Sequence, residues 1–414
     1  MMSDARADGL RLAIFTDTYP PQVNGVARTL ARLAQAIEQR GGAVRIVTIA
    51  DPGASSDAGP DATPDVTPDA TPDSQVERWP SIPFWAYPQL RIAAPSRQRA
   101  LDLIDQWKPN LVHVATEFGV GLAGLFAAEE AGVPVVTSYH THFKAYLEFY
   151  NLSALGPVAW PYLRWFHNRG RRTFAPSGIV ARELEQIGFE NMRVWSRGVD
   201  GSRFSPSFRS EAMRAHLGVT RPDQVIVSYV GRLAREKDLI VLMRAMHAMR
   251  ERAGDRAGDR VVFAIVGDGP AEAECRAAAP TGTVFTGKLT GRELAAAYAS
   301  ADIFAFPSIT ETFGNVVLEA MASGLAVVAP DIGATTEYAT PETAVQFRAK
   351  DAESFAGQLL RLVDDSALRA RIAASGLAFA RATTWDSIFD RLVRDYRDVV
   401  ASAQAALPRS ATRR

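Results

Sequence analysis

The sequence LAIFTDTYPPQVNGVARTLARLAQAIE, at residues 12–38, predicts a strand, a loop and a helix in that order. Its first four residues form a short apolar run, which suits a buried strand. A loop rich in proline, asparagine and glycine follows, and apolar residues then recur at helical spacing through Glu38. This is the repeating unit of a sheet whose parallel strands are joined by helices.

The same alternation continues along both halves of the 414-residue chain. Apolar runs at residues 44–49, 111–114 and 133–138 predict further strands, with an alanine-rich helix at 124–131 between the last two. The alternation restarts at residues 225–230 and continues at 261–266, 303–306 and 326–329. The sequence therefore predicts an α/β protein with two Rossmann-like, doubly wound domains.

The segment at residues 195–206 has few periodic apolar positions and contains Gly198 and Pro206, which favours a linker there. We therefore expect a first domain at residues 1–197 and a second at 198–382. We expect residues 383–414 to form a helix that packs back on the first domain and ends in a frayed tail. A tandem Thr-Pro-Asp repeat falls within residues 51–75, whose composition favours a disordered loop over a calcium site.

The overall composition excludes several classes of protein. Lys plus Arg and Asp plus Glu both total 46, so no net positive charge favours binding to nucleic acid. Cys275 is the single cysteine, which excludes an internal disulfide and suits the reducing cytoplasm. The polar N-terminus does not resemble a secretory signal, and no apolar run is long enough to span a bilayer. We therefore expect a cytoplasmic protein.

The segment TETFGNVVLEA, at residues 310–320, combines two glutamates with a predicted helix start. Gly314 permits a tight turn, Asn315 is the expected N-cap, and Glu319 lies about one turn into the helix. Amides at such a helix start attract a diphosphate, and a nearby carboxylate can accept hydrogen bonds from the hydroxyls of ribose. Glu311 could bind a second sugar. For this segment alone, a capped helix with solvated glutamates is an equally good interpretation.

Other polar residues follow predicted strands, at the edge where doubly wound sheets bind ligands. Gly25 opens the first helix, so its backbone could approach a phosphate closely. Arg232 and Lys237 follow the strand at 225–230 and could bind phosphate oxygens, although basic residues in loops are usually solvated. Gly267 begins a Gly-Asp-Gly-Pro loop that leaves room for a base or ribose, but this loop lacks the third glycine of a dinucleotide site.

The motif Ser-Tyr-His-Thr-His, at residues 138–142, ends a predicted strand. Two histidines at this spacing could chelate a metal, but no Asp or Glu nearby completes a site, so we favour a polar contact by one histidine. The sequence contains no convincing Asp-x-Asp loop at a strand end either. We therefore expect no metal and no cofactor.

Taken together, these segments resemble the family-four retaining glycosyltransferases of the GT-B type, in which two Rossmann-like domains face each other across a cleft. The resemblance covers nearly the whole chain and depends most on Glu311 and Glu319, Arg232 and Lys237, and Gly25. It implies that Arg232 and Lys237 bind the donor diphosphate, that Glu319 holds the ribose, and that Glu311 and His140 contact the donor. The resemblance further implies donor contacts for Phe313, Gly314, Asn315, Gly25, Lys288 and Leu289.

Within that family, the chain is similar both to bacterial GDP-mannose-dependent mannosyltransferases and to sulfoquinovosyltransferases. The resemblance implies transfer of a hexose, with mannose from GDP-mannose as the first candidate and a UDP-sugar as the alternative, onto a lipid or glycan. An epimerase or a reverse phosphorylase of similar fold, and a noncatalytic nucleotide-sugar sensor, are further alternatives. Aromatic residues at 160–166 followed by Arg169, Arg171 and Arg172 suit a peripheral contact with the inner membrane, although core packing together with solvated arginines explains them somewhat better.

Overall fold

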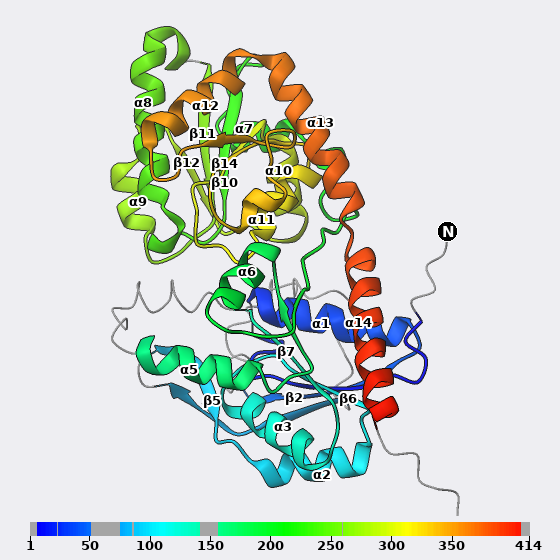
Figure 1. Cartoon of the computed structure of the whole chain (residues 1–414). Helices are drawn as coiled ribbons and strands as arrows, with labels where there is room; N and C mark the ends of the chain where they lie inside the picture. Colours follow the sequence, from blue (N-terminus) through cyan, green and yellow to red (C-terminus); the bar gives the residue numbers. More distant parts are fainter. Residues whose placement is uncertain are drawn as a thin grey trace, which may run out of the picture.

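A computed structural model of the protein describes residues 6–22, 24–50, 75–84, 87–140, 156–258 and 260–406. Two separate parallel sheets organise the chain into two α/β domains, one above the other in Figure 1. The predicted fold of two Rossmann-like domains is thereby confirmed. Most of the predicted loop at residues 51–75 and the frayed tail fall outside the described residues.

The first domain contains a seven-stranded sheet in the order β3-β2-β1-β6-β7-β8-β9. Its strands are β1 (Arg11–Phe15), β2 (Ala43–Ile49), β3 (Val76–Trp79), β6 (Leu111–Val114), β7 (Val135–Ser138), β8 (Arg172–Ala175) and β9 (Met192–Val194). An antiparallel hairpin comprises β4 (Ser81–Phe84) and β5 (Tyr87–Ala93). The helices are α1 (Gly25–Gln39), α2 (Arg97–Trp107), α3 (Gly119–Glu130), α5 (Gly156–His167) and α6 (Gly178–Gln186).

The second domain contains a six-stranded sheet in the order β12-β11-β10-β13-β14-β15. Its strands are β10 (Val225–Val230), β11 (Val261–Val266), β12 (Val284–Gly287), β13 (Ile303–Ala305), β14 (Ala326–Pro330) and β15 (Val345–Phe347). Its α-helices are α7 (Glu211–His216), α8 (Leu239–Gly258), α9 (Glu272–Ala278), α10 (Gly291–Ser300), α11 (Asn315–Ala322), α12 (Ala352–Asp364) and α13 (Ser366–Ala382). The 3-10 turns described in this domain are η3 (Pro206–Phe208), η4 (Arg235–Lys237) and η5 (Ala334–Glu337).

The helix predicted at residues 124–131 begins five residues earlier, as α3 at Gly119. Glycines are poor helix formers, so the Gly-rich start carried no helical signal. The tertiary contacts explain it: a Cβ on Gly121 would lie 1.8 Å from the Thr116 carbonyl oxygen, and one on Gly124 would lie 2.3 Å from the Phe15 ring. The glycines therefore let α3 lie directly against β1 and the end of β6.

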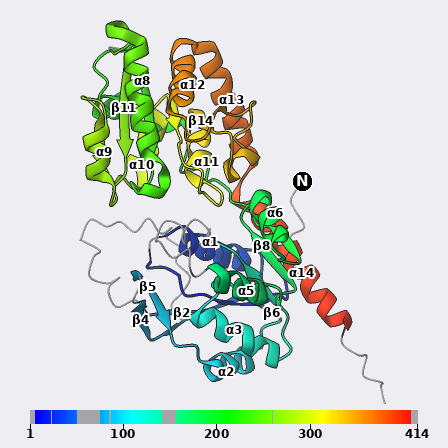
Figure 2. The ribbon, with the colours of Figure 1, turned by 60° about the vertical axis from the view of Figure 1, so that its left-hand side comes forward.

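The last helix, α14 (Trp385–Ala406), packs on the first domain although it follows the second. In Figures 1 and 2 it runs down from α13 and lies beside α1. Ile388, Phe389 and Leu392 are buried in the same cluster as Leu30 and Leu33 of α1. The two segments that link the domains run together, because the Val199 amide donates to the Thr383 carbonyl at 3.0 Å.

Candidate functional site

The predicted residues of the second domain lie around the point where the strand order reverses. In the order β12-β11-β10-β13-β14-β15, this point lies between β10 and β13. The loop after β10 carries Arg232 and Lys237, and the loop after β13 carries Glu311. Open α/β sheets bind ligands beyond the carboxyl ends of strands at such a point.

The structure joins these two loops through a charged pair. Lys237 Nζ lies 2.5 Å from Glu311 Oε1, and each side chain is about one-fifth exposed (21% and 22%). The Thr310 hydroxyl also donates to the Glu236 carbonyl at 2.8 Å. Lys237 and Glu311, far apart in the sequence, therefore form one partly buried site. Arg232 is exposed at the end of β10, and its carbonyl accepts a hydrogen bond from Tyr229 at 3.1 Å.

The start of α11 corrects one prediction about Asn315. The N-cap is Gly314, in the left-handed conformation with φ of 88°, and Asn315 is the first helical residue. A glycine favours this conformation because it has no Cβ, and it brings no side chain to cap the helix. The Asn315 Oδ1 atom is buried and has no hydrogen-bond partner in the part of the chain that the structure describes.

Tyr338 holds the turn before α11, a role for which its place in the sequence carries no signal. Its hydroxyl lies 2.6 Å from the Phe313 carbonyl oxygen and 2.8 Å from that of Gly314, which share its single proton. Its ring stacks on Phe313 with centroids 5.0 Å apart. A Cβ on Gly314 would lie only 2.8 Å from Thr335 Cγ2. The turn is therefore fixed by packing before any ligand binds.

Glu319 lies one turn into α11 and is half-buried. The Tyr298 hydroxyl of α10 donates to its Oε2 atom at 3.0 Å. Burial raises the pKa of Glu319, while Tyr298 and the cations Arg28 and Arg203 act in the opposite direction. Glu319 thus lies in a partly desolvated position, which strengthens any hydrogen bond that it accepts.

The first domain contributes α1 to the same region. Gly25 opens this helix, Asn24 caps it by accepting from the Ala27 amide at 2.8 Å, and a Cβ on Gly25 would meet nothing within 4 Å. Arg32 lies further along α1 and stacks over Trp385 at 5.1 Å. Burial lowers the pKa of Arg32, while the charges of Asp200 and Glu319 raise it. α1 and α11 are therefore electrostatically coupled across the two domains.

The close packing of the backbone around Gly267 requires a glycine at this position, independently of any ligand. It adopts φ of 134°, and a Cβ there would lie 2.0 Å from the Gly231 carbonyl oxygen. Its amide donates to the Gly287 carbonyl at 2.8 Å, so three strand-end loops pack backbone against backbone. Pro270 ends this loop two residues before α9 begins at Glu272.

Lys288 and Leu289 follow β12 directly. Lys288 is exposed, whereas Leu289 is half-buried against the core of the second domain. These two predicted base contacts therefore differ: Lys288 faces solvent and Leu289 also has a packing role.

His140 lies just beyond β7 with both ring nitrogens engaged by protein groups. Nε2 lies 2.8 Å from Ser138 Oγ, and Nδ1 lies 3.0 Å from Arg197 Nη2. Burial and the Arg197 charge hold the pKa of His140 well below its usual range. His140 is therefore a neutral imidazole fixed in orientation. Its partner Arg197 was not among the residues predicted to form the site, and His142 lies outside the described residues.

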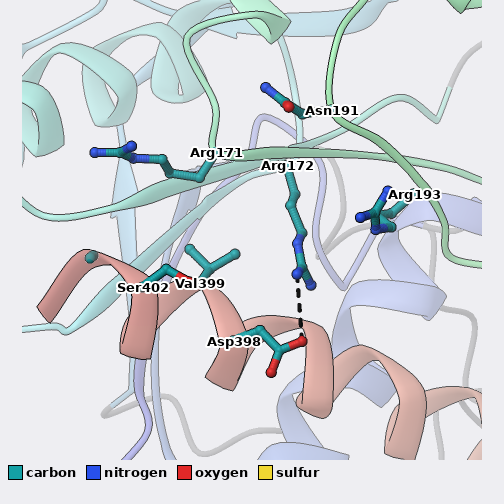
Figure 3. Close-up of a pocket in the computed structure, with 8 residues that line it drawn as sticks. Arg171, Arg172, Asn191, Arg193, Asp398, Val399 and Ser402 are labelled. Atoms are coloured by element: carbon teal, nitrogen blue, oxygen red, sulfur yellow. Dashed lines mark hydrogen bonds and ion pairs between the residues drawn. The ribbon is translucent and has the colours of Figure 1, made fainter. Parts of the chain in front are cut away.

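A cavity of about 270 Å³ lies between the β8–β9 edge and α14 and includes none of the predicted donor residues. Figure 3 shows Arg172 pointing toward Asp398, and the two side chains form an ion pair at 3.5 Å. Arg172 also forms an ion pair with Asp395. These ion pairs hold α14 against the first domain.

Among the described residues, no three His, Cys, Asp or Glu side chains form a potential metal site, and independence from metal stays a prediction.

The aromatic segment at residues 160–166 lies in α5 and is only partly buried. Leu163 and Phe166 belong to the core, whereas Trp165 is 39% exposed and lies 6.0 Å from the ring of Phe126, which is 36% exposed. Arg169 stacks over Trp165 and pairs with Glu129 at 2.6 Å. No described helix combines the length and apolarity that a membrane span requires.

Comparisons with known proteins agree with this arrangement. The family model for Glycosyltransferase Family 4 matches residues 23–203, and the model for Glycosyl transferases group 1 matches residues 224–365. A GDP-mannose-dependent alpha-mannosyltransferase of Mycolicibacterium smegmatis is 34% identical over 394 residues, covering 94% of this chain and 98% of that protein. A sulfoquinovosyl transferase of Arabidopsis thaliana is 34% identical over 298 residues, covering 70% of this chain and 56% of that protein.

Among solved structures, the Anabaena protein HepE in complex with UDP superimposes with a TM-score of 0.71 at 19% identity. The match covers 94% of this chain and 99% of that one, which shows a shared fold. Both domains of the present chain are thus accounted for, one by each family model. The chain belongs to glycosyltransferase family 4, and it is a hexosyltransferase with the GT-B fold.

Proposed function

We propose that the protein transfers mannose from GDP-mannose, with retention at the anomeric carbon, onto a lipid or glycan acceptor. The observation that carries this proposal is the site at the β10–β13 switch point, where Lys237 and Glu311 pair beside the α11 start. The similarity to the Mycolicibacterium mannosyltransferase supports GDP-mannose as the donor. The similarity to the plant sulfoquinovosyl transferase supports a UDP-sugar as the alternative.

Departure of the diphosphate is the step that these residues would assist. Breaking the bond to the sugar leaves new negative charge on the phosphate oxygens, and cations or amides that are already in place stabilise that charge. Lys237 has three N–H donors and uses one on Glu311, so two remain for phosphate. The first amides of α11 have no side-chain cap, and Arg232 adds a fork of donors. This set would act without a metal.

The remaining groups would hold the nucleoside and the sugar. Glu319 would accept hydrogen bonds from the ribose hydroxyls, using the carboxylate capacity that Tyr298 leaves. The unpartnered Oδ1 of Asn315 would accept from a sugar hydroxyl, which would remove the cost of burying it alone. Gly25 would admit a phosphate to the α1 start, and Gly267, Lys288 and Leu289 would border the base. His140 would form the first-domain side of the donor site.

We place the acceptor on the first domain and the protein in the cytoplasm, at the inner face of the membrane where a lipid acceptor would lie. The exposed rings of Trp165 and Phe126 support a peripheral contact. Flotation with neutral and anionic vesicles tests this contact. Equal recovery with both vesicle types, or no recovery with either, would remove it.

The donor is tested by incubating the purified protein with GDP-mannose and a panel of UDP-sugars, together with a lipid extract. We expect GDP release and a mannosylated product only with GDP-mannose, and much slower formation of both with the Lys237→Met variant. Turnover of a UDP-sugar instead would establish the alternative donor. Donor conversion without acceptor would indicate an epimerase, and binding without turnover would indicate a sensor.

A further inference from the structure

A chain of hydrogen bonds connects His140 to both segments that link the two domains. Tyr396 Oη on α14 lies 2.7 Å from His113 Nδ1, and His113 Nε2 lies 2.9 Å from Ser138 Oγ. Ser138 Oγ lies 2.8 Å from His140 Nε2, and His140 Nδ1 lies 3.0 Å from Arg197 Nη2. The side chains of Tyr396, His113, Ser138 and Arg197 are buried, and His140 is partly buried. The network therefore behaves as one unit, shielded from water.

The direction of two of these bonds is fixed by the chemistry of arginine. A guanidinium only donates, so His140 Nδ1 must accept from Arg197. A neutral imidazole that accepts at Nδ1 carries its proton on Nε2, so His140 must donate to Ser138 Oγ. Arg197 is itself held in place, because its Nη1 atom donates to the Trp195 carbonyl at 2.8 Å. Its position thus selects the tautomer of His140.

Arg197 stands where the chain leaves the first domain. The next residue, Gly198, packs so closely on the returning segment that a Cβ would lie 2.4 Å from the Trp385 amide nitrogen. α14 begins at Trp385 and carries Tyr396, the other end of the network. Both ends of the chain of hydrogen bonds therefore depend on how the two domains are connected.

We propose that Arg197 is a positioning residue that holds His140 as the neutral Nε2–H tautomer in a fixed orientation just beyond β7. Tyr396 and His113 brace the same ring from α14, so the orientation of His140 depends on the linking segments. The charged or titratable groups around His140 in the described part of the chain are Arg197, His113 and His167, and His167 pairs with Glu117. Arg197 is the permanent charge among these three. The functional part of this inference depends on the proposed donor contact of His140, whereas the tautomer does not.

The tautomer is tested by NMR of the full-length protein labelled with ¹⁵N-histidine. The chain has six histidines, and His140→Gln assigns the ring signals of His140. We expect a single neutral Nε2–H form from pH 5 to 8 in the wild type. Arg197→Met should allow protonation as the pKa of His140 rises toward its ordinary value of 6.5. Ser138→Ala should keep the tautomer, because Arg197 still donates to Nδ1. Unchanged His140 signals in Arg197→Met would overturn the proposal.

The kinetic readout separates positioning from general stability. We expect Arg197→Met to lower kcat roughly 10- to 100-fold with a smaller change in KM, and to add a loss of activity on the acidic side of the pH profile. Arg214→Met is the matched control, because Arg214 is 5% exposed, Arg197 is 7% exposed, and the described hydrogen bonds of Arg214 go to second-domain groups. This control should lower the melting temperature without adding the acidic limb. An equal pH profile in both variants would contradict the proposal.

Failure of the positioning role of Arg197 can be distinguished from failure of the donor contact of His140. Arg197→Leu, which likewise removes both the charge and the donor to Nδ1, replaces Arg197→Met if that variant does not fold, and the same readings apply. If His140→Gln keeps full activity while Arg197→Met changes the tautomer, the donor contact of His140 fails and the positioning inference stands. If the tautomer is unchanged while His140→Gln abolishes activity, the positioning inference fails alone.

Discussion

Replacing Glu319 by glutamine should weaken donor binding while leaving the fold intact. Tyr298 donates to Oε2, so one carboxylate oxygen and part of the other are available to ribose. A hydrogen bond to a charged group contributes about 1.5–3 kcal/mol, and a vicinal diol makes two. Glutamine keeps one neutral acceptor, so we expect a loss of about 2–3 kcal/mol, and Glu319→Ala should lose about 2–5 kcal/mol.

The loss for Glu319→Gln corresponds to about 30- to 150-fold weaker binding. Isothermal titration with GDP measures it directly, because GDP contains the ribose and the diphosphate. Glu293→Gln, on the exposed face of α10, is the matched control and should bind GDP like the wild type. Wild-type protein should also prefer GDP to 2′-deoxy-GDP, and Glu319→Ala should lose that preference. A preference that persists in Glu319→Ala would refute the ribose assignment.

Glu319→Gln should weaken donor binding but stabilise the folded protein at neutral pH, and the sign of this effect on stability follows from the pKa of Glu319. Burial raises the pKa of Glu319 in the folded protein. A raised carboxyl pKa means that stability is greatest when the group is protonated and is lost as pH rises through the folded pKa. Glutamine cannot ionise, so the melting temperature of Glu319→Gln relative to wild type should be higher at pH 7.5 than at pH 5. A difference independent of pH would contradict this account.

Three further predictions concern the same loops. Lys237→Met should lower single-turnover transfer about 10²- to 10³-fold, because it removes the cation that would stabilise the leaving diphosphate. An unchanged rate would show that Lys237, in its pair with Glu311, does not have this role. Gly314→Ala should lower the free energy of unfolding in urea by about 1–3 kcal/mol, since φ of 88° and the contact with Thr335 both oppose a Cβ. Tyr338→Phe should cost about 1 kcal/mol in the same titration and weaken GDP binding; wild-type values for both would show that its hydroxyl does not hold the turn.

The sequence by itself determined the secondary structure that repeats. Strands such as residues 225–230 and 261–266 are short, mostly apolar runs, and each needs only its local sequence to be recognised. It also determined that polar groups such as Arg232 and Glu311 follow strands, because that placement is local. In a parallel sheet these ends share one edge, so local patterns alone are enough to predict a ligand site there.

Only the tertiary structure decided which groups meet and what holds them. The strand order places β10 beside β13, which brings Lys237 to Glu311 although 74 residues separate them. Tyr298, Tyr338 and Arg197 support the site from other elements, and their spacing from it in the sequence carries no periodic signal. Local sequence also favours Asn over Gly as a cap, yet the helix starts after Gly314. The turn needs a left-handed residue with no Cβ beside Thr335, a packing constraint that the sequence does not display.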